Sequence, residues 1–171
     1  EGLQIGDTIA ICMENHLGYF PLTWAAQRAG LHYVCISNRL TAGEVGYIIQ
    51  DSGAKMLFGS AAMTELFDAL AKDRPNVKQL MHGGTGARDL DAALVGLPIT
   101  PIADERAGTD MLYSSGTTGR PKGVRIPLPQ DPAIDGMNSL VGLASQAFGL
   151  SGESIYLSPA PLYHAAPLRW C

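Results

Sequence analysis

Short β-rich runs alternate with helical patterns along the first half of the chain, and this alternation most limits the folds open to it. Four runs have the length and composition of buried strands, and a helical spacing of apolar residues or a helix cap lies between successive runs. The runs are residues 7–13, 31–37, 54–60 and 76–82. Such alternation is typical of βαβ units. We therefore predict an α/β fold: a doubly wound, mostly parallel sheet with flanking helices.

Local signals place the helices between these runs. Asn15 can cap a first helix that Gly30 ends, and Pro21 either delays the start of this helix or kinks it. Thr41 and Glu44 have the spacing of a capping box, in which each side chain bonds the backbone N–H of the other residue. The second helix therefore has a well-defined start.

The chain divides into four segments. Residues 1–82 hold the alternating units, and residues 83–109 form a connection rich in Gly, Pro and Asp. Residues 110–126 read as strand, loop and strand, and residues 127–171 as a helix, a strand and a final segment. The chain opens without methionine and stops without a capping or turn residue, so we expect it to be part of a longer protein.

Composition excludes several classes of protein. A chain of 171 residues suits one domain, and 46% apolar with 16% charged residues is far from the composition of disordered chains. The net charge of −4 argues against nucleic acid as a partner, and no apolar run is long enough to span a membrane. We expect a cytoplasmic protein. Cys12 and Cys35 lie in apolar runs and are expected to be reduced core thiols.

The stretch "YSSGTTGRPKGV", residues 113–124, is dense in groups that bind anions. Backbone N–H groups freed by glycine can converge on an anion, short hydroxyls add donors, and a lysine adds positive charge. A polyphosphate suits this set of groups. The same residue types also make ordinary surface turns, so the residues alone leave both interpretations open. The donors are Ser114, Ser115, Thr117, Thr118 and Lys122, together with Gly116 and Gly119.

Two better-known phosphate motifs do not fit the chain. A Walker A loop counted from Gly116 puts Pro121 at its second glycine and Gly123 at its hydroxyl. A dinucleotide fingerprint in residues 83–89 puts Asp89 at its third glycine, which leaves that stretch as a plain turn.

The stretch 113–124 resembles, over all twelve positions, the phosphate loop of the adenylate-forming superfamily. That superfamily comprises acyl-CoA synthetases, the adenylation domains of peptide synthetases, and beetle luciferases. Two further stretches resemble the family in the right order. They are "AQRAGLHYVCISNRLTAGEVGYIIQDSGAKMLF" (26–58) and "LSPAPLYHAAP" (157–167). By this resemblance the chain is an incomplete N-terminal domain of an AMP-binding enzyme.

The resemblance implies a two-step reaction with ATP, Mg²⁺ and CoA. A carboxylic acid, such as a fatty acid, is first activated as its acyl adenylate, and a thiol then takes the acyl group. The hydroxyls of the loop and Lys122 would hold the phosphates, with Lys122 also acting in catalysis, and Gly116 and Gly119 would let backbone N–H groups approach. His164 would act at the acid and pantetheine site, with Tyr163 beside it.

The other histidines and Trp24 are not assigned to the site by this resemblance. His16, His32 and His82 lack metal-binding partners at suitable spacing, so we expect structural roles for them. Trp24 is expected in the core, because aromatic residues at helical spacing are mostly buried.

Other functions stay open. A peptide-synthetase adenylation domain is less favoured, since such domains usually carry an aspartate-bearing segment where this chain has His164. A non-catalytic binding or scaffold protein would keep the fold without the chemistry, and a dinucleotide-binding module fails on glycine spacing. The family's adenine, ribose and C-terminal lysine motifs lie outside this sequence. We therefore expect the 171 residues to be inactive alone and to expose apolar surface that favours self-association.

Overall fold

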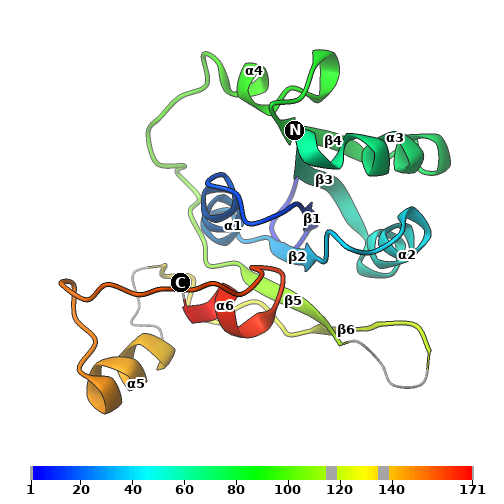
Figure 1. Cartoon of the computed structure of the whole chain (residues 1–171). Helices are drawn as coiled ribbons and strands as arrows, with labels where there is room; N and C mark the ends of the chain where they lie inside the picture. The colour runs from blue at the N-terminus through cyan, green and yellow to red at the C-terminus, as the bar shows by residue number, and fades with distance from the viewer. Residues whose placement is uncertain (1, 115–118, 135–138, 171) are drawn as a thin grey trace.

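A six-stranded sheet forms the centre of the computed structural model, which describes residues 2–114, 119–134 and 139–170 (Figure 1). The strand order is β4–β3–β1–β2–β5–β6, and every neighbouring pair is parallel except β5 with β6. The predicted mostly parallel sheet is therefore confirmed. The strands are β1 (Thr8–Cys12), β2 (His32–Ile36), β3 (Ala54–Ser60), β4 (Lys78–His82), β5 (Thr109–Ser114) and β6 (Lys122–Arg125).

Helices cover both faces of this sheet, as a doubly wound fold requires. Side chains of β1 alternate between two cores: Ile9 and Ile11 pack with helices α1 and α6, whereas Ala10 and Cys12 pack with α2 and α3. The α-helices are α1 (Tyr19–Arg28), α2 (Ala42–Ser52), α3 (Thr64–Asp73), α4 (Leu90–Leu94), α5 (Ser139–Phe148) and α6 (Ala165–Trp170), with 3₁₀ turns at Ala61–Met63 and Gly86–Arg88.

The first helix begins later than its predicted cap. Its N-cap is Gly18, not Asn15, so Pro21 falls in the first turn, where helix N–H groups have no partner within the helix. The side chain of Asn15 is used elsewhere, by a segment more than 140 residues away. The predicted cap at Asn15 is therefore wrong, and Pro21 delays the helix without interrupting it.

The second helix begins as the sequence predicts. The Thr41 hydroxyl accepts a hydrogen bond from the Glu44 backbone N–H, and the Glu44 carboxylate accepts one from the Thr41 N–H at 2.8 Å. Gly53 ends the helix in the left-handed conformation with φ of +67°, which glycine adopts without steric cost.

Trp24 is not a core residue. Its side chain is 51% exposed, because the buried face of α1 is formed by Tyr19, Leu22, Thr23 and Ala26. Trp24 lies off that face and borders an open cleft of about 660 Å³ that Leu168 and Arg169 also line. Helical spacing located the helix but assigned this tryptophan to the wrong face.

The strand predicted within residues 127–171 is absent from the described part of that segment, where the structure has only α5 and α6. Ile155 is fully exposed and Leu157 is 83% exposed. A strand needs a neighbour for its backbone N–H and C=O groups, and no strand pairs with these residues in the described ranges.

Two cysteines lie in the core as unpaired thiols. Burial raises the pKa of Cys12 to about 12 and that of Cys35 to about 12. Only a thiolate reacts readily with alkylating agents, so we expect neither residue to be labelled by iodoacetamide at pH 8 in the folded chain. Mass spectrometry of a Cys171→Ser variant checks this, with full labelling in guanidinium as the control. Rapid labelling of the native chain would contradict this burial.

Candidate functional site

The predicted phosphate loop is carried by the β5–β6 hairpin. The two strands are antiparallel, and their last pair in register is Ser114 opposite Lys122, so the structure brings these two predicted site residues together. The Ser114 hydroxyl lies 3.5 Å from the Lys122 carbonyl oxygen. The two strands follow each other in the order that the sequence predicts. The remaining predicted donors, Ser115, Gly116, Thr117 and Thr118, lie outside the described residues.

The described end of the loop has features that suit close approach of a ligand. Gly119 has φ of +145°, a conformation that residues with a side chain rarely adopt, and a Cβ there would meet no atom within 4 Å. Lys122 is exposed, so its ammonium group is free of the core.

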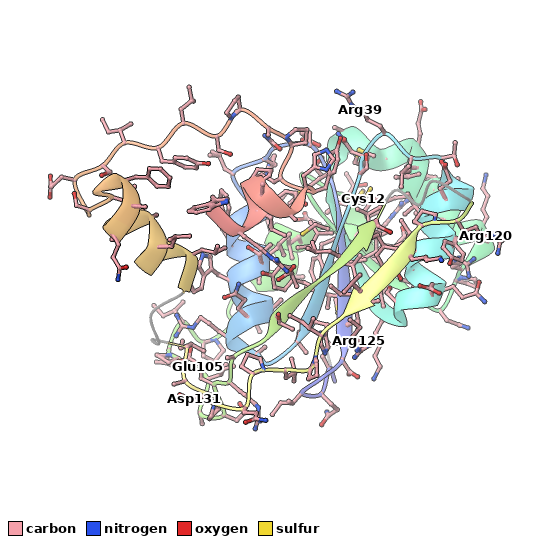
Figure 2. All side chains as sticks on the ribbon, turned by 90° about the horizontal axis from the view of Figure 1, so that it is seen from below. Cys12, Arg39, Glu105, Arg120, Arg125 and Asp131 are labelled. Atoms are coloured by element: carbon pink, nitrogen blue, oxygen red, sulfur yellow. The ribbon has the colours of Figure 1, made fainter. Side chains whose placement is uncertain are left out.

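Helix α2 holds both stems of the hairpin. The Tyr113 hydroxyl donates to the Asp51 carboxylate at 2.6 Å, and the Tyr47 hydroxyl donates to the Pro121 carbonyl at 3.2 Å. The Arg120 guanidinium lies over the Tyr47 ring, 5.2 Å from its centroid, and Figure 2 shows Arg120 beside this helix. Burial and the Asp51 carboxylate raise the pKa of Tyr113, which keeps its hydroxyl a donor.

The other end of β6 is anchored at the start of β1. Arg125 donates through one nitrogen to the Thr8 hydroxyl at 3.3 Å and through another to the Gly6 carbonyl at 2.7 Å. In Figure 2 Arg125 and Arg120 accordingly lie at opposite ends of this strand. The hairpin is thus fixed at its base, next to the central strands, and at the ends of its strands nearest the loop, next to α2.

The carboxyl ends of the parallel strands form the edge where ligands bind in doubly wound folds. Here the hydroxyl of Ser60, the last residue of β3, donates at 2.6 Å to the carboxylate of Glu14, which follows β1. Ser114 ends β5 at the same edge, because β5 runs parallel to β2. The predicted phosphate loop therefore follows the end of β5 at the edge that this fold uses for ligands.

The segment that carries His164 reaches the same edge. Asn15 follows β1, and its side chain forms hydrogen bonds with the backbone of Ala160 and Leu162, which precede His164 by four and two residues. His164 is exposed, and its ring centroid lies 4.5 Å from that of Tyr163. The structure thus places Tyr163 and His164 beside the end of the central strand.

An ion pair joins this segment to the strand that carries the loop. Arg169 of α6 donates two hydrogen bonds to Asp110 of β5, at 2.8 and 3.2 Å, and Asp110 is only 8% exposed. Figure 1 shows α6 beside β5. Removing the guanidinium would leave a buried carboxylate without its partner, which is strongly destabilising.

Several of these contacts have no local signal in the sequence. The bonds from Asn15, Tyr47 and Arg169 join residues separated by 145, 74 and 59 positions, respectively. Only Tyr47 and Asp51 offer a clue, since they are four residues apart and so share a face of α2.

The three other histidines make contacts of a structural kind. His82 lies 3.3 Å from Asp91 through Nδ1 and stacks on His16, with centroids 5.1 Å apart. His32 is buried, which lowers its pKa and keeps it neutral. Within the described ranges no three His, Cys, Asp or Glu side chains are grouped to hold a metal ion, and no helix there has the length and apolar character to cross a bilayer.

Comparison with known proteins identifies the family. The model of the AMP-binding enzyme family matches residues 1–171. A 4-hydroxybenzoate–CoA/benzoate–CoA ligase from Rhodopseudomonas palustris is 29% identical over 96% of this chain and 30% of its own length. The long-chain-fatty-acid–CoA ligase FadD13 from Mycobacterium tuberculosis is 29% identical over 98% of this chain and 32% of its own length.

Solved structures agree with these relatives. An inhibitor-bound N-terminal domain of FACL13 from Mycobacterium tuberculosis is 27% identical and superposes with a TM-score of 0.74 over 99% of this chain and 42% of its own. The chain spans about a third of the length of the curated relatives it matches. Its sheet and flanking helices match the N-terminal domain of adenylate-forming enzymes, and the chain belongs to the AMP-binding enzyme family.

Proposed function

We propose that the protein containing this chain activates a carboxylic acid with ATP and transfers the acyl group to CoA. The observation that carries the proposal is the Ser/Thr/Gly-rich loop, whose two ends meet at Ser114 and Lys122 and whose stems are held by α2. Holding both stems fixes where the donors of the loop begin and end. The named activities of the relatives, which are acid–CoA ligases, support the same reaction class.

In the first step a carboxylate oxygen of the acid attacks the α-phosphorus of ATP. An O–P bond forms, the bond to the bridging oxygen breaks, and pyrophosphate leaves. Both reactants are anions, so donors that hold the β- and γ-phosphates and the leaving pyrophosphate lower the barrier. We assign this role to the loop hydroxyls, to the backbone at Gly116 and Gly119, and to Lys122. The hydroxyls are those of Ser114, Ser115, Thr117 and Thr118.

In the second step the thiolate sulfur of CoA attacks the acyl carbonyl carbon, a C–S bond forms, the bond from that carbon to the phosphate oxygen breaks, and AMP leaves. We assign Tyr163 and His164 to the place where the acid and the pantetheine arm meet, because they lie beside the carboxyl end of the central strand. Mg²⁺ would come with ATP. It commonly binds substrate phosphates together with one or two carboxylates.

The rest of the longer protein is the first partner that we propose for this chain. Large apolar side chains of α5 and the segment after it are exposed in the described residues, among them Phe148 at 80% and Ile155 at 100%. Contact with the remaining two thirds of such an enzyme would cover them. We therefore propose that the 171 residues alone do not complete adenylation, and full turnover by the isolated chain would contradict this.

The experiment that tests the function is acid-dependent ATP–pyrophosphate exchange by the full-length protein. The panel should contain fatty, aromatic and amino acids, with Thr117→Ala as the control. Exchange with one class of acid that falls at least about tenfold in the variant would support adenylation and identify the substrate class. Exchange with amino acids alone would favour a peptide-synthetase domain. ATP binding without exchange for any acid would favour a non-catalytic binding protein.

A further inference from the structure

The side chain of Asn15 makes a two-point contact with the segment that precedes His164. Its Nδ2 donates to the Ala160 carbonyl at 3.1 Å, and its Oδ1 accepts from the Leu162 backbone N–H at 2.9 Å. A donor and an acceptor on one planar amide fix both the position and the direction of the backbone they bind. Asn15 itself follows β1, whose residues are buried throughout.

The bonded backbone leads directly into His164. The His164 N–H donates to the Pro161 carbonyl at 3.1 Å, and the His164 carbonyl accepts from the Leu168 N–H at 3.1 Å, so residues 161–164 form the turn that starts α6. Leu162 and Leu168 are 6% and 8% exposed and anchor this turn and helix in the core beneath. Whatever holds Ala160 and Leu162 therefore sets where the backbone of His164 lies.

The far end of α6 has its own anchor. Arg169 binds Asp110 on β5, and Asp110 precedes Ser114 by four residues, or about 13 Å along the strand. The short helix thus links the end of β1 to the strand that carries the phosphate loop. Loss of the Asn15 contacts would loosen only the first end, where burial of Leu162 would be the remaining anchor, because Leu168 and the ion pair still hold the second.

We propose that Asn15 is a positioning residue, which holds residues 160–162 and thereby fixes His164 relative to the phosphate loop. The inference rests on the proposed function for its effect on catalysis, and on the contacts above for its effect on structure. A displacement of about 1 Å in a reacting group can reduce a rate about 100-fold, so two hydrogen bonds at this place can matter far more for turnover than for folding.

The structural test is hydrogen exchange of the full-length protein at the Leu162 amide. We expect Asn15→Ala to speed exchange at Leu162 about tenfold or more, because the acceptor of that N–H is lost, and to leave strand β3 unchanged. Asn76→Ala, at an exposed asparagine between α3 and β4, is the matched control. Asn15→Asp keeps an acceptor for Leu162 and loses the donor to Ala160. Its rate of hydrogen exchange at Leu162 should lie between those of wild type and Asn15→Ala. Asn15→Asp replaces the alanine variant if that one does not fold.

The catalytic test is a double-mutant cycle with His164. We expect Asn15→Ala to lower kcat for ATP–pyrophosphate exchange about 10- to 100-fold, with the KM for ATP changed less than about twofold. In a His164→Ala background the same change should have less than about a threefold effect, because a residue that acts through His164 has little left to act on. A general structural role would instead multiply the two effects, and that result would overturn the proposal.

The two tests fail separately from the proposed function. If the wild-type protein folds but no acid of the panel supports ATP–pyrophosphate exchange, the proposed function is refuted. Hydrogen exchange at Leu162 would still test the inference, because it does not depend on turnover. An unchanged rate of hydrogen exchange at the Leu162 amide in Asn15→Ala would overturn the inference even if the enzyme is active.

Discussion

Alanine at Lys122 is expected to slow acid-dependent ATP–pyrophosphate exchange by about 100- to 1,000-fold, the effect of removing one well-placed donor to a developing negative charge. Lys122 pairs with Ser114 where the loop closes, and its side chain is exposed, so the substitution removes the charge without disturbing the core. The pyrophosphate that leaves would lose its point-charge partner. We therefore expect the loss mainly in kcat, with a smaller change in the KM for ATP.

The measurement compares Lys122→Ala with Lys122→Arg and with Lys72→Ala. Arginine keeps the charge but not the compact geometry of an ammonium group, so it should restore part of the rate. Lys72 is an exposed lysine in the last turn of α3, and its loss should leave exchange within about twofold of wild type. Wild-type exchange in Lys122→Ala would contradict the assignment of this lysine to the phosphates.

Alanine at Phe67 is expected to lower the free energy of unfolding by about 3–5 kcal/mol, the usual effect of removing a buried phenylalanine. Phe67 is fully buried on the inner face of α3, and a Cβ on Gly59 of β3 would lie 2.4 Å from its ring. The ring therefore occupies the space that the glycine leaves open. A cavity there would lie in the core shared by α2, α3 and the sheet.

Urea unfolding of the 171-residue chain checks this, with Phe148→Ala as the matched control. Phe148 is 80% exposed at the end of α5, so its removal should change the free energy of unfolding by less than about 0.5 kcal/mol. Equal losses in the two variants would contradict the placement of the core on α3.

Much of the fold could be predicted because its signals are local. Ile9, Ala10, Ile11 and Cys12 form a continuous apolar run, and their side chains pack alternately into the two cores. This is expected for a strand covered on both faces. The capping box at Thr41 also depends on residues three apart. Trp24 shows the limit of such signals. Spacing identifies the helix, but the face it buries depends on what packs against it.

For the candidate site, the sequence predicts only the two flanking strands in a form that the structure can check. Strands are expected at 110–113 and 123–126, and the structure has β5 and β6 there; their antiparallel pairing, with Ser114 opposite Lys122, comes from the structure. The contacts that support this hairpin did not follow from the sequence, because Tyr47 and Pro121 are 74 positions apart and are brought together only by the tertiary fold. The roles of Lys122 and His164 remain predictions.

The sequence by itself determined several local parts of this protein: the runs that become β1 to β4, and the residue at which α2 begins. Tertiary structure alone decided which of these parts meet. Asn15 could have capped the adjacent helix, and its amide instead binds residues 145 and 147 positions away, where the folded chain brings a free backbone N–H and C=O within its reach. Helix caps and strand patterns depend on residues that are close together in the chain. The contacts of Asn15 depend instead on the order of strands in the sheet. The order β4–β3–β1–β2–β5–β6 is what brings the end of β1, the loop after β5 and the turn at His164 to one edge.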